Sequence, residues 1–218
     1  MFDLEALLLS IKLALWTLVL LLPFGIWVGH SLLRSGRYKP WIEACLALPL
    51  VLPPTVIGYY LLTGFSGVNI LGFPLVFSFT GILLASLIVN LPFAIQPIQR
   101  AFESINPEIR EAAQVSGLST WQTFRLIELP LAWRGITSAA VLTFAHTLGE
   151  FGVVLMVGGA IPGETKTVSI AIYDKVQSFD TQGAGLLSLL LLGICLVAIV
   201  ISYGILGQNK NAALDGKL

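Results

Sequence analysis

The stretch EAAQVSGLSTWQTFRLIELP, residues 111–130, is a polar segment in a chain that otherwise consists largely of long apolar blocks. The whole chain has 218 residues, of which 56% are hydrophobic and 11% are charged, and its mean hydropathy is +0.88. This composition is typical of membrane proteins, because an ordinary soluble domain has about 25% charged residues. The polar segment is therefore expected to lie outside the lipid bilayer.

Five apolar blocks surround this segment, and each is long enough to cross a bilayer, since a hydrocarbon core of about 30 Å requires roughly 20 apolar residues per helix. The alternating ten-residue strands of a membrane barrel are absent from the sequence. No basic residue precedes the first block, and it is longer than the apolar part of a signal peptide, so we expect it to be retained as a helix. We predict one all-α membrane domain, residues 1–218, with five transmembrane helices at residues 6–33, 41–62, 74–98, 136–157 and 183–206.

The basic residues indicate which loops face the cytoplasm, because cytoplasmic loops carry an excess of Lys and Arg. The prediction places the N-terminus outside, the C-terminus in the cytoplasm, a cytoplasmic loop at residues 99–135 and an extracytoplasmic loop at residues 159–182. Lys166 and Lys175 are exceptions in the outer loop, and Lys12 near the outer end of the first block is expected to reach the interface. The residues that set this pattern are Arg34, Arg37, Lys39, Arg100, Arg110, Arg125, Arg134, Lys210 and Lys217.

The cytoplasmic loop is predicted to form two short helices with a sharp bend between them. Asn106, which precedes a proline, is typical of a helix start, and Gly117 suits a left-handed C-terminal cap. Ser119 and Gln122 have the spacing of a capping box for the second helix. Pro130 is expected to end that helix, because the residue before a proline avoids helical angles.

The spacing of residues 111–130 resembles the EAA signature, E-A-A-x3-G-x9-I-x-L-P, of the membrane subunits of bacterial-type ABC importers. The resemblance implies that the first loop helix docks in a cleft on an ATP-hydrolysing subunit, while the end of the signature seats the second helix against the bundle. A solvated loop without such a role is the alternative. The docking positions are Glu111, Ala112, Ala113 and Gly117, and the seating positions are Ile127, Leu129 and Pro130.

The sequence contains no G-x-x-x-x-G-K-[ST] loop for binding phosphates, so the chain is not expected to be an enzyme, and ATP hydrolysis is assigned to a separate subunit. The resemblance implies a multi-pass permease of the cytoplasmic membrane that works by alternating access. Its partners would be two ATPase subunits, a second copy of this chain and an extracytoplasmic oxyanion-binding protein, besides membrane lipid. Neither a cofactor, a metal site nor nucleic acid is expected.

Residues 146–177, HTLGEFGVVLMVGGAIPGETKTVSIAIYDKVQ, resemble the matching stretch of molybdate-type permeases, which share G-E-F, L-M, I-P-G-x-T-x-T and A-I-Y. Residues 48–62, LPLVLPPTVIGYYLL, are similar to the second helix of the same family. Ala160 departs from the family pattern, in which Asn is frequent. The resemblance implies molybdate, or tungstate, as the cargo. A permease for sulfate or another oxyanion and a stand-alone secondary anion carrier are the alternatives.

Polar residues inside the fourth block indicate a transport pathway. Thr143, His146, Thr147 and Glu150 recur at helical spacing and are predicted to share one helix face. A carboxylate within a membrane costs about 2.5 to 3.5 kcal/mol, so Glu150 should face the interior with His146 as its partner. A polar clamp between helices is the alternative.

Prolines interrupt the second and third blocks, where broken helices are typical of a pathway or hinge, although kinks that serve packing are as common. A dianion would be repelled by Glu150, and Lys12 is the one cation in the apolar blocks, so we expect a passage of low affinity lined by neutral donors. Pro49 and Pro92 are among the interrupting prolines. The pathway and gate candidates are Pro53, Pro54, Thr55, Tyr59, Ser86, Asn90, Thr143, His146, Thr147 and Glu150.

Overall fold

A computed structural model of the chain describes residues 3–70 and 72–215. The regular secondary structure of these residues is helical except for one short antiparallel hairpin. The predicted all-α fold is therefore confirmed. In chain order the elements are α1 (Leu4–Ser31), η1 (Leu32–Arg34), η2 (Gly36–Tyr38), α2 (Lys39–Val51), α3 (Pro54–Phe65), β1 (Asn69–Ile70), β2 (Phe73–Pro74), α4 (Phe79–Glu103), α5 (Pro107–Val115), α6 (Thr120–Thr123), η3 (Phe124–Glu128, a π-helix), α7 (Leu129–Gly149), α8 (Gly152–Gly158), α9 (Val168–Gln177) and α10 (Thr181–Asp215).

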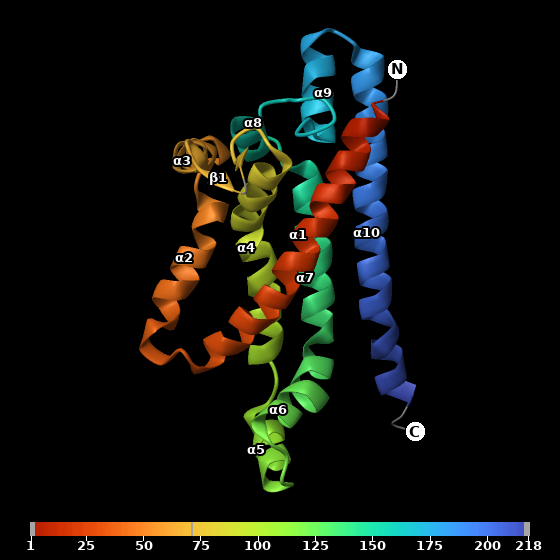
Figure 1. Cartoon of the computed structure of the whole chain (residues 1–218). Coiled ribbons are helices and arrows are strands. Elements are labelled where there is room, and N and C mark those ends of the chain that lie inside the picture. The colour runs from red at the N-terminus through yellow and green to blue at the C-terminus, as the bar shows by residue number, and fades with distance from the viewer. Residues whose placement is uncertain (1–2, 71, 216–218) are drawn as a thin grey trace.

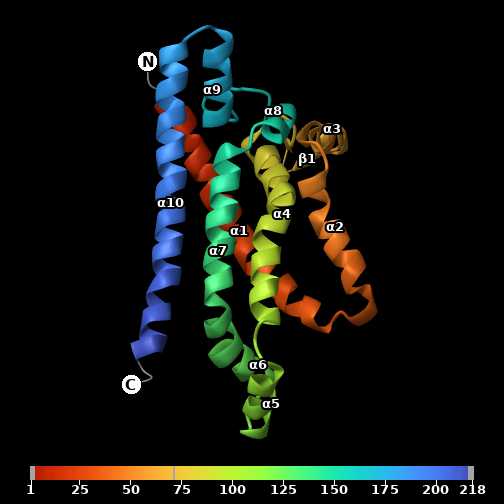
Figure 2. The ribbon, with the colours of Figure 1, turned by 180° about the vertical axis from the view of Figure 1, so that it is seen from behind.

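The long helices form a bundle in which α1 crosses α4 and α7 obliquely, while α10 runs along its edge (Figure 1). Seen from behind, α2 rises on the far side of α4, away from α10 (Figure 2). The short helices α5 and α6 project from one end of the bundle, and α3, α8 and α9 gather at the other (Figures 1 and 2). The two ends of the molecule are thus built from different short helices.

Within the described residues, three helices are long and apolar enough to cross a membrane, and two bent helix pairs raise the number to five if each pair is one span. The single spans are Leu4–Arg34, Phe79–Glu103 and Thr181–Ile201. α4 is the central helix, with 56% of its apolar window buried in the chain, whereas only 11% of the corresponding window of α10 is buried. An all-round apolar helix that its own chain leaves uncovered faces lipid or another protein.

The second span is broken, as its prolines predicted, and the fourth span has a break that the sequence analysis did not predict. The chain bends by 105° between α2 and α3 and by 59° between α7 and α8. At the first bend Leu52 and Pro53 take extended angles, with ψ of 139° and 137°, because each precedes a proline and so avoids the helical region. Pro49, by contrast, lies inside α2 without ending it.

The third span also differs from its predicted limits. Its helix starts at Phe79 and not at residue 74, because Ser78 caps it by accepting the amide of Gly81 at 3.2 Å. Pro92 lies within this helix, which continues unbroken to Glu103. The prediction that Pro92 interrupts the block was therefore wrong, since the loss of one backbone donor is tolerated where neighbouring helices pack around it.

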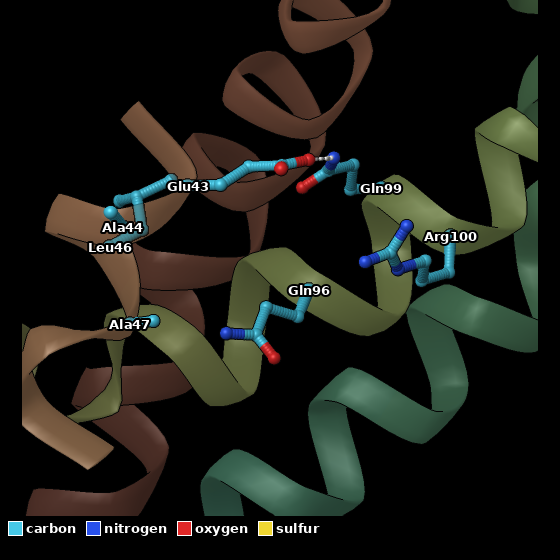
Figure 3. A pocket seen from close by; sticks show the side chains of 7 residues that line it. All are labelled: Glu43, Ala44, Leu46, Ala47, Gln96, Gln99 and Arg100. Atoms are coloured by element: carbon cyan, nitrogen blue, oxygen red, sulfur yellow. Dashed lines mark hydrogen bonds between the residues drawn. The ribbon is translucent and has the colours of Figure 1, made fainter. Parts of the chain in front are cut away.

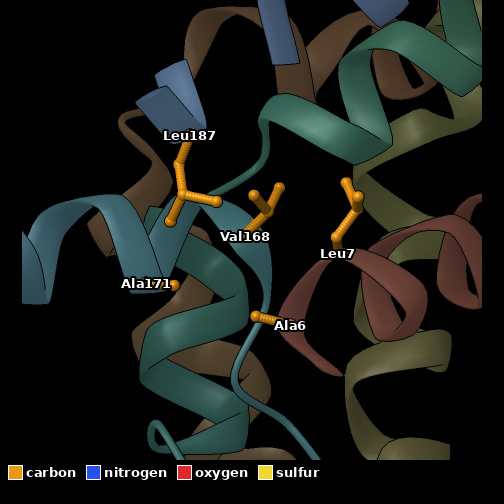
Figure 4. Packing of buried hydrophobic residues seen from close by; sticks show 5 residues of the cluster. All are labelled: Ala6, Leu7, Val168, Ala171 and Leu187. Atoms are coloured by element: carbon orange, nitrogen blue, oxygen red, sulfur yellow. The ribbon is translucent and has the colours of Figure 1, made fainter. Parts of the chain in front are cut away.

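Within the 159–182 segment, residues Val168–Gln177 form the helix α9. Its first amide, on Val168, donates to the Ser10 hydroxyl of α1 at 2.8 Å, so a neighbouring helix satisfies a donor that α9 itself cannot. Around this bond, apolar side chains of α1, α9 and α10 pack together (Figure 4). The residues of this cluster are Ala6, Leu7, Val168, Ala171 and Leu187.

The two lysines that depart from the basic-residue pattern are both paired with acidic groups. Lys166 lies 2.8 Å from Asp174, and Lys175 lies 2.7 Å from Asp180. The hydrogen bond from Lys175, helped by the Gly183 amide, holds the pKa of the Asp180 carboxyl below its ordinary value. Both lysines of this segment are therefore held in ion pairs, and its extracytoplasmic position stays a prediction.

The contact between α4 and α7 depends on Gly135, and this gives a testable prediction. A Cβ built on Gly135 would lie 2.4 Å from the Ala101 Cβ and 2.6 Å from the Pro97 carbonyl oxygen. We expect G135A to destabilise the protein by about 1–3 kcal/mol, because overpacking forces the backbones apart. Thermal unfolding in detergent measures this, with a lower Tm as the expected result.

The control is G185A in α10, where no described residue from another part of the chain lies within 4 Å of the added Cβ. G185A should leave the Tm unchanged or raise it slightly, because alanine favours the helix over glycine by about 1 kcal/mol at most. Equal Tm values for G135A and the parent protein would contradict the close packing of α4 on α7.

Candidate functional site

Residues 107–128 form a segment that projects from the bundle, and we call it the projecting segment. It consists of α5, α6 and η3. Asn106 caps α5 by accepting the Glu108 amide at 3.1 Å, as predicted. At the other end Gly117 has φ +83°, and the Leu118 amide donates to the Ala113 carbonyl at 3.1 Å. Both predicted caps of the first helix are therefore confirmed.

The predicted capping box of the second helix is also present. The Gln122 amide donates to the Ser119 hydroxyl at 3.3 Å, and the Gln122 side chain accepts the Ser119 amide at 2.8 Å. The prediction that this helix ends at Pro130 was wrong, because α6 continues through the π turn of η3 into α7. The proline ring would clash with the carbonyl four residues earlier in a regular α-helix, and the wider π turn relieves that clash.

The signature residues divide into an exposed and an inner group. Glu111, Ala112 and Gly117 are exposed, whereas Ala113 is 5% exposed and is the one buried residue of α5. Ile127 and Leu129 are half-buried, and Leu129 packs on the cluster around Ile98 and Phe102 of α4. Pro130 is exposed. Exposed residues are the ones that another protein can contact directly.

Sequence reasoning missed the apolar side chains that the projecting segment exposes. Val115 is 90% exposed, Trp121 66% and Leu126 61%. Large apolar residues on short polar helices outside a bilayer are typical of a protein contact surface. The signal was visible in the sequence, because these residues stand at positions that no membrane span explains.

Arg110 fastens the projecting segment to the bundle, and sequence reasoning missed this residue as well. Its guanidinium donates to the Phe102 carbonyl at 2.6 Å, at the end of α4, and to the carboxylate of Glu128. Glu128 is only 4% exposed. A buried carboxylate requires such a partner, because an unpaired charge away from water is costly.

A pocket of about 300 Å³ lies between α2 and α4 (Figure 3). The Gln99 side chain bridges Glu43 of α2 and Glu103 of α4, and Lys39 binds Glu103 at 2.7 Å. These residues were not among the predicted candidates, although Gln96 inside the third apolar block and Gln99 directly after it were a signal. The lining residues are Glu43, Ala44, Leu46, Ala47, Gln96, Gln99 and Arg100.

A polar cluster joins α4 to the end of α7. His146 lies with its Nδ1 3.1 Å from Asn90 Oδ1 and its Nε2 3.8 Å from Glu150 Oε2. The ring of Phe93 stacks on His146 with centroids 4.1 Å apart. The predicted pairing of His146 with Glu150 is therefore present, and Asn90 from the third span belongs to the same cluster.

The predicted polar stripe does not continue as one helix face through Glu150. Glu150 takes extended angles, and its carboxylate accepts the Val153 amide at 3.0 Å, which caps the start of α8. Ser86 and Thr143 are both buried, and they stand four and three residues before Asn90 and His146 in the sequence. Their hydroxyls have no hydrogen-bond partner among the described residues. Thr147 donates to the Thr143 carbonyl at 2.7 Å.

The other predicted gate residues lie at the bend between α2 and α3 and in the first turns of α3. They are Pro53, Pro54, Thr55 and Tyr59, and all four are exposed. The two bends meet, because a Cβ built on Gly152 would lie 2.9 Å from the Pro54 Cβ. Likewise a Cβ on Gly58 would lie 2.8 Å from the Met156 Cβ, so α3 and α8 pack closely at small residues.

Residues 21–211 match the family described as binding-protein-dependent transport system inner membrane component. The molybdenum transport system permease protein of Azotobacter vinelandii is 44% identical over 191 residues, 82% of this chain and 83% of that protein. The protein of the same name from Escherichia coli strain K12 is 35% identical, with 96% of both chains covered. A probable sulfate transport system permease protein of Chlorella vulgaris is 31% identical over 90% of this chain and 77% of its own.

Solved structures show the same fold. A bacterial alginate ABC transporter in complex with its pentasaccharide-bound periplasmic protein matches with a TM-score of 0.75 and 19% identity, over 94% of this chain and 78% of that chain. The methionine ABC transporter in an inward-facing conformation matches with a TM-score of 0.71 and 17% identity, over 93% and 92%. The fold of this chain is therefore one found in ABC transporters.

The bend of the projecting segment yields a prediction at Gly117. Nothing lies within 4 Å of a Cβ at this position, so a substitution is opposed by the positive φ alone. We expect G117V to cost about 1–3 kcal/mol locally and G117N much less, because Asn tolerates left-handed angles. Hydrogen exchange of the Gly117 and Leu118 amides should accelerate strongly in G117V and weakly in G117N. Equal exchange in both variants would contradict the proposed cap.

Proposed function

This chain belongs to the family of binding-protein-dependent transport system inner membrane components, and from that premise we propose that it is the permease subunit of an ATP-driven importer of molybdate or tungstate. It is a multi-pass membrane protein. The observation that carries the cargo is the 44% and 35% identity to molybdenum permeases over most of each chain. The 31% identity to a probable sulfate permease keeps sulfate as the second candidate.

We assign the docking of the ATPase subunit to the exposed face of α5. Glu111 and Ala112 are exposed there beside Val115, and together they offer one carboxylate and a small apolar surface to an ATPase subunit. Ala113 supports the same helix from inside, and Gly117 allows the bend that directs it. Because the sequence has no phosphate-binding loop, the ATPase must be a separate chain, and two copies fit a homodimeric permease.

The remaining partners follow from the uncovered surfaces. Only 11% of the apolar window of α10 is buried, so lipid or a second copy of the chain is needed to cover the rest. The end that carries α3, α8 and α9 lies opposite the projecting segment (Figure 1). We propose that this end, with the loop at residues 159–182, faces outward and receives cargo from an extracytoplasmic oxyanion-binding protein, while residues 99–135 face the cytoplasm.

The pathway is proposed to run along the polar cluster of α4 and α7. The buried hydroxyls of Ser86 and Thr143 have no partner among the described residues, so they are free to donate to an oxyanion. One oxygen of the Glu150 carboxylate accepts the Val153 amide, which reduces the repulsion between this carboxylate and a dianion. The bent spans would open and close this passage in an alternating-access cycle.

Transport itself is the first test. Vesicles that contain this chain, an ATPase subunit and an oxyanion-binding protein are expected to accumulate labelled molybdate only when ATP is supplied. Tungstate should compete strongly and sulfate weakly. Uptake without ATP would contradict the proposal of an ATP-driven importer. Stronger competition by sulfate than by tungstate would identify sulfate as the cargo.

The second test is the substitution E111R. Reversing this exposed charge should abolish ATP-dependent uptake and release the ATPase subunit, because a like charge at a protein contact costs several kcal/mol. Co-purification of the ATPase subunit and molybdate uptake are the measurements. E164R reverses an exposed charge far from α5 in sequence and should keep the ATPase subunit bound. Normal uptake by E111R would refute the docking role.

A further inference from the structure

We infer that Arg110, Glu128 and His30 form a polar strut, centred on the buried Glu128 carboxylate, that transmits movement of α5 to the ends of α1 and α4. This inference rests on the proposed function, because it assumes that α5 docks on an ATPase subunit. None of the three residues is a defined position of the EAA signature: Arg110 precedes Glu111, and Glu128 stands at the variable position between Ile127 and Leu129.

Glu128 is the centre of the strut. One carboxylate oxygen accepts the Nε proton of Arg110, from α5, and the other lies 2.8 Å from Nε2 of His30, in the last turn of α1. An ionised carboxylate only accepts hydrogen bonds, so His30 donates through Nε2. Residues 98 positions apart in the chain are thereby joined through one side chain.

Arg110 extends the strut to α4. Besides Glu128, its guanidinium donates to the Phe102 carbonyl at 2.6 Å and to the Ile105 carbonyl at 3.4 Å. The Phe102 carbonyl, in the last turn of α4, also accepts the Ile105 amide at 3.3 Å, and the guanidinium adds a charged donor at the helix end where a cation is favourable. One planar side chain thus fixes the position of α5 relative to both α4 and η3.

Aromatic rings surround the strut and limit its access to water. The His30 ring makes edge contacts with Phe102 and Phe124, at centroid distances of 5.3 and 4.8 Å. Electrostatic interactions are stronger in such surroundings than in water. The Glu128 side chain at the centre of the strut is 6% exposed, so its two contacts are screened less by water than those of a surface ion pair.

The rest of α5 offers few other links to the bundle, because Ala113 is its one buried residue. A buried ion pair is also no better for stability than well-packed apolar residues, so stability alone does not account for it. The specific contribution of the strut is to transmit movement. A displacement of Glu111 moves the adjacent Arg110, and Arg110 in turn moves the end of α4 and, through Glu128, the end of α1. Arg110 and Glu128 are therefore positioning residues for transport.

The test measures transport and ATP hydrolysis in the same vesicles. E128Q and R110K should retain the ATPase subunit and hydrolyse ATP at near the parent rate. The number of molybdate ions imported per ATP should fall at least about fivefold, the lower end of typical coupling between sites. R110K is expected to fail because the compact lysine ammonium cannot reproduce the planar fork with which the guanidinium reaches Glu128, Phe102 and Ile105. The double variant R110Q/E128Q should be no worse than its single variants, since the pair acts as a unit.

R34Q is the matched control, because Arg34 lies near the same end of α1, is exposed and has no ion pair among the described residues. It should transport with the parent ratio. An unchanged ratio in R110K and E128Q would overturn the strut, and so would loss of uptake that merely parallels loss of the bound ATPase subunit in both. Absence of ATP-dependent uptake by the parent protein would instead refute the proposed function.

Discussion

A lipid bilayer offers no hydrogen bonds, so every amide exposed by a break in a membrane helix must find its partner within the protein. The bend between α7 and α8 meets this demand with a carboxylate, because Glu150 accepts the Val153 amide. At the bend between α2 and α3, Pro53 and Pro54 have no amide hydrogen, so these two positions need no acceptor. The two broken spans that shape one end of the molecule therefore exist because their local sequences solve this problem.

The opposite end of the molecule obeys the same rule with different residues. Asn106, Gly117, Ser119 and Gln122 satisfy the termini of α5 and α6, which lie outside the apolar spans. Arg110 supplies donors to carbonyls at the end of α4. Capping at this end keeps two short helices folded although they bury little apolar surface, and helices this short would be marginal on their own.

Local sequence patterns predicted the features that depend on neighbouring residues. The five apolar blocks, the caps of α5 and the capping box of α6 all follow from spacing within a few residues. Pro130 was misinterpreted, because a π turn lets a helix continue where a proline ordinarily ends it. The contact of His30 with Glu128 was out of reach, since nothing in either local sequence identifies a partner 98 positions away.

The close approach of α3 and α8 has a consequence for the number of independent shapes that this end of the molecule can adopt. Gly58 lies against Met156 and Gly152 against Pro54, so neither helix can tilt without displacing the other. A change of angle at one bend must therefore be accommodated at the other, because the two helices that follow the breaks share one close contact.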